Sequence, residues 1–140
     1  MLLLLVACFA PLDGVYTLDT TAGWDGFCDT SSWEETDPGA SNIAVDVAGD
    51  QQSMILTDAG GDYACSMEGA DFDCPLFDDT TAVTRDVRVR STLDMEGTWD
   101  SNTSFLGSFI VALTCAEGDC PAYGYDDCTS VMDITGVLAD

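Results

Sequence analysis

The sequence contains no histidine and no lysine, and its only basic residues are Arg85, Arg88 and Arg90. Without histidine or lysine, catalysis by a Ser–His–Asp triad, a Cys–His pair or a lysine base is excluded. Zinc sites usually need histidine or cysteines at CxxC spacing, and neither occurs in the chain. We therefore expect a non-enzymatic protein with no catalytic residues, no metal ligands and no bound cofactor.

Acidic residues dominate the charge, because 26 Asp and Glu against three Arg give a net charge of −23. Such a surface repels phosphate backbones, so no nucleic-acid partner is expected. It attracts cations, and calcium prefers carboxylate oxygens, although no EF-hand spacing is present. The plainer interpretation is a solvated acidic surface suited to high salt, which screens its self-repulsion. The candidate calcium clusters are Asp58 with Asp62, Asp71 with Asp73, Asp78 with Asp79, and Asp126 with Asp127.

The arginines are gathered on one expected strand, where Arg88 and Arg90 share the face opposite two valines. That alternation predicts that both guanidinium groups point outward. The plainer interpretation is ion pairing with neighbouring carboxylates such as Asp86 or Asp94. The alternative is a small positive patch formed by Arg88 and Arg90 that binds an anion or an acidic partner.

The chain has seven cysteines, an odd number that needs an explanation in an exported protein. If Cys8 has another role, six remain, enough for three disulfides in an oxidising compartment. The six are Cys28, Cys65, Cys74, Cys115, Cys120 and Cys128.

One pairing follows from a predicted hairpin over residues 62–76. A two-residue turn at Gly69-Ala70, with glycine first as a type II′ turn prefers, places Cys65 opposite Cys74. Pro75 cannot donate to a ladder, so pairing should stop near Cys74. The other four cysteines allow three connectivities, and we expect one bridge to join the Trp-bearing loop at 20–41 to the Cys-rich loop at 116–129.

The N-terminus begins with an apolar run, Leu2–Val6, followed by Ala7 and Cys8. Leu5-Val6-Ala7-Cys8 resembles the lipobox of bacterial lipoproteins. The resemblance implies that Cys8 receives diacylglycerol and becomes the first residue after cleavage. The run is short and has no basic residue before it, as expected if the signal begins upstream. The alternative is a hydrophobic first strand with an ordinary cysteine.

A lipobox fixes the expected organisation: residues 1–7 are a signal-peptide remnant, 8–13 a short lipid-anchored tether and 14–140 an acidic β domain. Phe9 stands where lipoproteins retained at the inner membrane carry Asp, which favours the outer membrane or cell surface. The expected partner is thus the membrane, through an N-terminal lipid. No protein or small-ligand partner is identified.

Short stretches of period-two alternation predict an all-β domain of about eight antiparallel strands. Short connections favour a small meander barrel stapled by disulfides, with a β-sandwich as the alternative. We expect a loop around Asp78-Asp79 and a turn over 97–104. The predicted strands are 14–19, 43–47, 53–57, two within 62–76, 83–95, 105–115 and 130–138.

Three weaker patterns concern function. Gly14-Val15-Tyr16 and Gly97-Thr98-Trp99 resemble the Gly-x-Trp motif of lipocalins, which implies a small-ligand barrel as an alternative function. A ligand barrel needs an empty interior of several hundred Å³, whereas inward Val, Leu, Met and Phe would fill this one. Asp29-Thr30-Ser31 resembles the motif of pepsin-like proteases, a low-weight carboxylate hydrolase alternative. The loop aromatics Trp24, Phe27, Trp33, Tyr123 and Tyr125 form either a binding rim or a plug.

Overall fold

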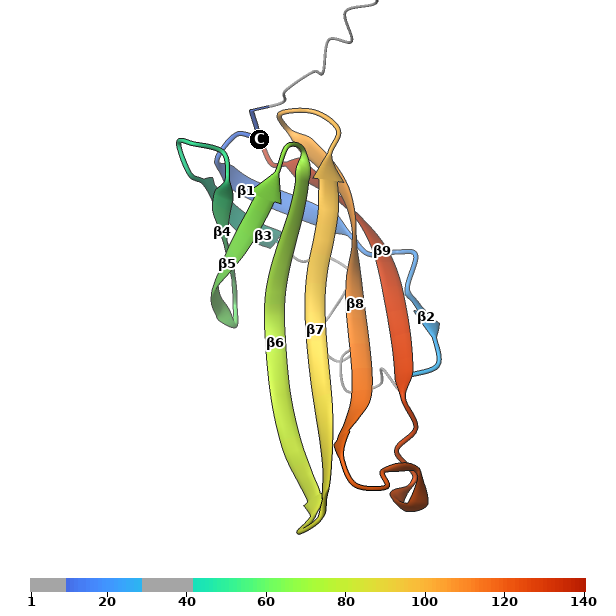
Figure 1. Ribbon diagram of the computed structural model, residues 1–140. Helices are drawn as coiled ribbons and strands as arrows, with labels where there is room; N and C mark the ends of the chain where they lie inside the picture. Colours follow the sequence, from blue (N-terminus) through green and yellow to red (C-terminus); the bar gives the residue numbers. More distant parts are fainter. Residues whose placement is uncertain (1–9, 29–41) are drawn as a thin grey trace, which may run out of the picture.

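The computed structural model describes residues 10–28 and 42–140, and these form one antiparallel sheet of nine strands. Pairing of β1 with β9 closes eight of the strands into a barrel, in the order β1-β3-β4-β5-β6-β7-β8-β9 (Figure 1). The expectation of a meander barrel is therefore confirmed, and the sandwich alternative is not. The strands are β1 (Gly14–Asp19), β2 (Trp24–Gly26), β3 (Asn42–Val47), β4 (Ser53–Asp58), β5 (Gly61–Glu68), β6 (Asp71–Thr84), β7 (Val87–Trp99), β8 (Ser104–Glu117) and β9 (Cys128–Leu138).

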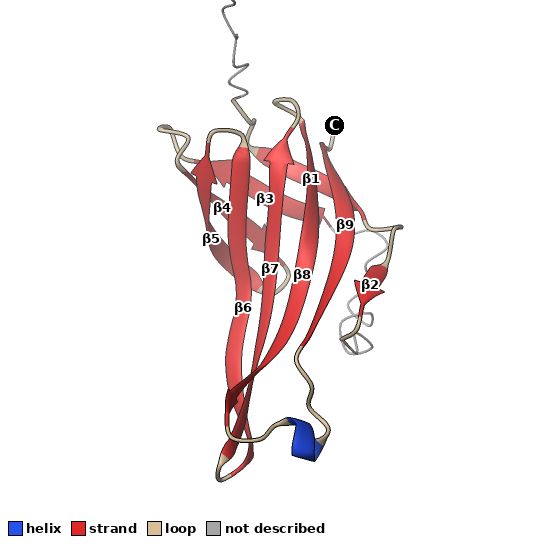
Figure 2. Ribbon diagram, turned by 45° about the vertical axis from the view of Figure 1, so that its right-hand side comes forward, coloured by secondary structure: helices blue, strands red, loops and turns tan. Residues whose placement is uncertain are grey.

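The barrel wall is much taller on one side than on the other. Strands β6, β7 and β8 have 14, 13 and 14 residues, whereas β3 and β4 have six each. The long strands therefore continue below the closed ring as a curved sheet (Figures 1 and 2). The short strand β2 pairs with the lower part of β9, below the segment that β1 occupies. We call the end with the C-terminus in Figure 1 the upper end and the other the lower end.

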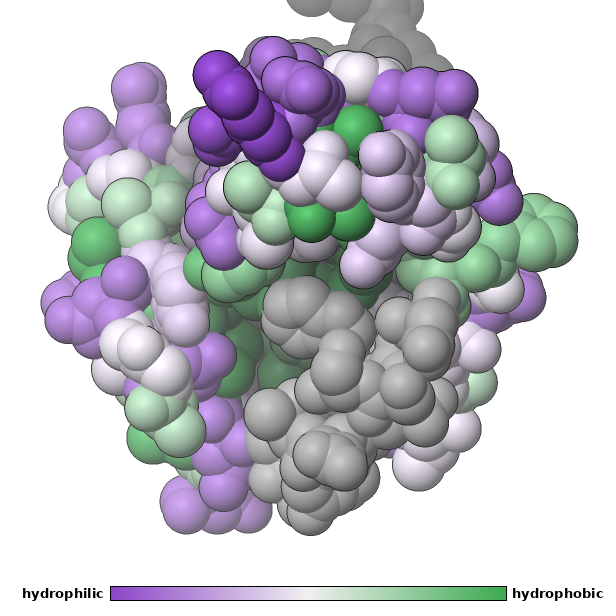
Figure 3. All heavy atoms as spheres, turned by 90° about the horizontal axis from the view of Figure 1, so that it is seen from below, coloured by the Kyte–Doolittle hydropathy of each residue, from purple (hydrophilic) through white to green (hydrophobic). Residues whose placement is uncertain are grey.

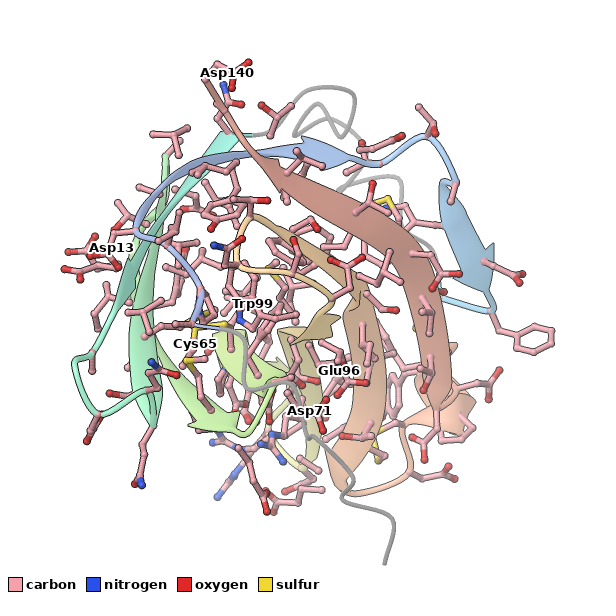
Figure 4. All side chains as sticks on the ribbon, turned by 90° about the horizontal axis from the view of Figure 1, so that it is seen from above. Asp13, Cys65, Asp71, Glu96, Trp99 and Asp140 are labelled. Carbon is pink, nitrogen blue, oxygen red and sulfur yellow. A yellow bond between two sulfur atoms is a disulfide. The ribbon has the colours of Figure 1, made fainter. Side chains whose placement is uncertain are left out.

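Four aromatic rings fill the upper end. Trp99 lies within 5.1–5.8 Å of Tyr16, Phe72 and Phe105, measured between ring centroids, at tilted or edge-on angles. Seen from above, Trp99 lies inside the ring of strands (Figure 4). All four side chains are buried, so the upper half is a packed core, as the inward Val, Leu, Met and Phe predicted.

Glycines opposite two of these aromatics make the packing feasible. Phe72 pairs with Gly97, and Phe105 pairs with Gly136 on the neighbouring strand. A Cβ on Gly136 would lie 2.2 Å from the Phe105 ring, and one on Gly97 would lie 2.6 Å from Phe72. The missing side chains thus leave the space that the rings occupy, a known device for turning barrel corners.

The β5–β6 hairpin has the predicted register. Ser66 faces Asp73, Met67 faces Phe72, and the turn falls at Gly69-Ala70, where Gly69 has a φ of 61°. The β5–β6 pairing ends at Ser66 and Asp73, close to the expected stop.

Two predicted connections are wrong. The strand β6 does not end at an Asp78-Asp79 loop but continues to Thr84, because its other edge pairs with β7. Pro75 lies opposite Asp94 in that pairing, and a bulge follows it. The turn expected over 97–104 is also shorter, since β7 reaches Trp99 and β8 starts at Ser104.

Candidate functional site

Two disulfides hold the lower end together. Cys28, just after β2, is bonded to Cys128 at the start of β9, and Cys115 on β8 is bonded to Cys120. The first bridge joins the two loops that the sequence predicted would be joined. Cys120 is fully buried and packs with Val87 and the neighbouring valine of β7 in a small second core.

The third disulfide lies in the upper barrel. Cys65 and Cys74 are bonded across β5 and β6, with their Cα atoms 4.3 Å apart, which confirms the predicted bridge. Such a short separation is typical of a non-hydrogen-bonded antiparallel pair. The three bridges use all six cysteines that follow Cys8, and they indicate an oxidising compartment. Cys8 itself lies outside the described residues.

A cavity of about 580 Å³ lies at the lower end, between β8 and the segment that leads into β9. Ser91, Val111 and Leu113 contribute from the inward-facing positions of the tall wall, and the Cys28–Cys128 bridge forms part of its border. Apolar side chains lie among polar ones in the view of this end from below (Figure 3). Its described lining is Phe27, Cys28, Ser91, Val111, Ala112, Leu113 and residues 124–128.

The loop aromatics do not all gather at this cavity. Phe27, which is 95% exposed, and Tyr125 line it, whereas Tyr123 projects into solvent from a short 3-10 turn, Pro121–Tyr123. Trp24 packs against the main core, so it belongs to the barrel interior. Trp33 and the Asp29-Thr30-Ser31 motif lie outside the described residues.

Both arginines of the predicted anion patch face carboxylates. Arg90 donates from Nε and Nη2 to the two carboxylate oxygens of Asp78, at 2.9 and 2.6 Å. This pairing lowers the pKa of Asp78 below its usual value. Arg88 lies 3.4 Å from Glu117. The side chains point outward and are about half exposed, as the alternation predicted.

The candidate calcium clusters instead make local hydrogen bonds. Asp58 accepts from the amide of Gly60, and Asp62 accepts from the hydroxyl of Thr57. Asp127 accepts from the amide of Cys115, which fixes the Cys-rich loop to β8. In residues 10–28 and 42–140, no group of three or more acidic or cysteine side chains is arranged to hold a metal ion.

An acidic groove of about 520 Å³ runs over the outer wall at the top of β5 to β8. Asp71 accepts a hydrogen bond from Thr98, and Glu96 comes from the next strand (Figure 4). Outside this groove, Asp94 has a raised pKa, because it is partly desolvated and repelled by Asp73 and Asp78. The groove's acidic lining is Glu68, Asp71, Asp73 and Glu96.

No known protein family, curated protein or solved structure matches this chain. Within the described ranges, no helix has the length and hydrophobicity needed to cross a bilayer.

The lower cavity was missed in the sequence because residues distant along the chain form it. Phe27 and Tyr125 meet only through the Cys28–Cys128 bridge, whose sequence separation is 100. The available signal was the pairing of the two loops, combined with the inward positions of β8. Ser91 and Val111 could then have been assigned to the same face.

Proposed function

We propose that this protein is a non-enzymatic lipoprotein of the cell envelope, anchored through a lipid on Cys8, with a binding or structural role. The observation that carries this proposal is the use of cysteines. Six are bonded to one another within the barrel, so Cys8 is the single remaining cysteine of the seven. It directly follows an apolar run that resembles a lipobox, and the oxidising compartment fits an exported chain.

The barrel's geometry supports an anchor at its upper end. Ala10, the first described residue, lies at that end, where the amide of Leu12 donates to the carbonyl of Asn102 in the β7–β8 turn. A lipid on Cys8 would bring this end close to the membrane, at its outer surface by the Phe9 argument. The tall wall and the lower cavity would then project away from it.

Mass spectrometry of the protein extracted from membranes tests the proposal. We expect an N-terminal peptide that begins at a diacylated Cys8 and no free thiol in the remainder. The full chain with Cys8→Ser is the matched control, and it should lose the lipid but keep its three disulfides. An unmodified Cys8 in membrane-extracted protein would overturn the anchor.

A lipocalin-like small-ligand function is the second candidate, and the lower cavity favours it. A volume of about 580 Å³ falls within the usual range for small-molecule sites, roughly 300–1,000 Å³. Phe27, Val111 and Leu113 offer apolar contacts, while Asp126 and Asp127 at the border disfavour anions. The expected ligand class is therefore neutral or cationic and largely apolar.

Titration with the neutral dye Nile red tests this second candidate. Ser91→Phe would place a ring in the cavity and should abolish saturable binding. Thr92→Phe is the matched control, because neighbouring strand residues point to opposite faces and Thr92 faces outward. Equal binding by both variants, or no saturable binding by the wild type, would exclude the cavity as an apolar site.

A further inference from the structure

Four exposed aliphatic side chains lie at or near the upper end of the barrel, and we call them the upper apolar patch. Leu106 is 55% exposed, Val137 54%, and Val15 and Leu12 46% each. Val15, Val137 and Leu106 occupy the outward positions of the adjacent strands β1, β9 and β8. Leu12 precedes β1 and is held over the β7–β8 turn.

The patch is free of charge on a protein with a net charge of −23. Val137 pairs with Thr17 and Ser104, and Leu106 pairs with Thr98 and Thr135. Val15 pairs with Ala44 on β3. None of these register partners is acidic.

The other side of the barrel shows that this absence of charge is local. Ile55 on β4 is similarly exposed at 41%, but it pairs with Asp46 as well as Ala64. In the ring order, β4 stands opposite β8. An exposed aliphatic beside a carboxylate is therefore available on the far wall as an internal comparison.

The structure assigns a partner to the upper apolar patch: we propose that it rests on the uncharged interfacial region of a lipid bilayer. The chain enters the described structure beside the patch at Ala10, and residues 1–9 include the apolar run Leu2–Val6. Whether that run or a lipid on Cys8 meets the membrane, the connection brings this end of the barrel to it. The inference rests on the membrane attachment in the proposed function and adds which face of the barrel touches lipid.

The charges around the patch specify the kind of bilayer. Asp13 and Asp140 lie at the periphery of the upper end (Figure 4), and Asp100 is in the β7–β8 turn. Anionic headgroups would repel these carboxylates, whereas zwitterionic headgroups would not. Contact should thus be strongest on zwitterionic lipid, and salt should restore contact on anionic lipid by screening.

A second copy of the chain is a poorer occupant. Two subunits would each bring a net charge of −23 to the interface. Stable interfaces also bury about 800 Å² per partner, more than four half-exposed aliphatic side chains provide.

Tryptophan quenching by lipids with brominated acyl chains tests the proposal on the full chain. Val137→Trp and Leu106→Trp report on the patch, Ile55→Trp is the matched control on the opposite wall, and the wild type gives the background of the three native tryptophans. After reconstitution into phosphatidylcholine vesicles, we expect the added emission of both patch variants to be largely lost. The Ile55→Trp emission should be unchanged.

The outcomes separate the patch from the anchor. Co-flotation with vesicles but equal quenching at all three positions, or none at any, would overturn the patch while leaving the anchor intact. Co-flotation with selective quenching but an unmodified Cys8 would support the patch and overturn lipidation. Failure to co-float would overturn both. Sedimentation as a dimer that Val137→Glu converts to monomer would assign the patch to a second copy and overturn the membrane contact.

Discussion

Removal of the Cys28–Cys128 disulfide is expected to destabilise the protein more than removal of Cys115–Cys120. The first bridge spans a sequence separation of 100 and the second a separation of 5. In the chain-entropy model, closing a loop of about 100 residues contributes roughly 4.7 kcal/mol, and closing one of about six contributes roughly 2.2 kcal/mol. The difference arises because the long loop restricts the unfolded chain far more.

Packing losses narrow that difference without reversing it. Cys120 is fully buried, so its replacement by alanine adds about 1 kcal/mol for the lost contacts. The expected totals are therefore about 4.7 kcal/mol for Cys28→Ala with Cys128→Ala and about 3 kcal/mol for Cys115→Ala with Cys120→Ala. Guanidinium unfolding followed by tryptophan fluorescence measures both. With an m-value of about 4 kcal/mol/M, the first pair should lower the midpoint by roughly 1.2 M.

The order of the two losses decides whether this reasoning holds. A larger loss for the Cys115–Cys120 pair would refute it, since loop entropy cannot favour the shorter bridge. An unchanged midpoint for the Cys28–Cys128 pair would show that the unfolded chain is already compact between these residues.

Three further predictions concern the core, one ion pair and the charge as a whole. Gly136→Ala should destabilise by about 1–3 kcal/mol through overpacking against Phe105, measurable by chemical unfolding, and no loss would show that the ring can shift. Because Arg90 lowers the pKa of Asp78, the pair should stabilise the fold above pH 4 or so, the unfolded carboxyl value, and lose this effect as acid protonates Asp78. Asp78→Asn should therefore lower the melting temperature at pH 7 but not at pH 2, compared with wild type at each pH. Added sodium chloride should raise the melting temperature by screening the net charge of −23, and a fall would contradict dominant self-repulsion.

The best-predicted parts of the fold depend on local chemistry. The β5–β6 hairpin and its Cys65–Cys74 bridge followed from one turn residue and strict alternation over about a dozen positions. The arginine orientation followed from the same alternation on β7. In each case, neighbours in sequence are also neighbours in space, so the pattern contains the answer.

The errors arose where the tertiary pairing overrides local signals. Asp78-Asp79 has the composition of a loop, yet both residues pair with β7, and Asp78 gains Arg90 as a partner. Pro75 ends the pairing with β5 but not the strand, because its other edge faces β7. The upper apolar patch was not found either, since Val15, Leu106 and Val137 come together only when β1 closes on β9.

The two ends of the barrel are stabilised by different means, and this difference bears on function. Four packed aromatics hold the upper end, where hydrophobic burial suffices. At the lower end, the second core of the described chain buries only Val87, Val89 and Cys120, and two disulfides supplement it. A cavity removes contacts that would otherwise stabilise its walls, so covalent bridges can maintain an open site that packing alone would leave weak. The proposed division therefore places membrane contact at the self-sufficient end and any ligand binding at the bridged end.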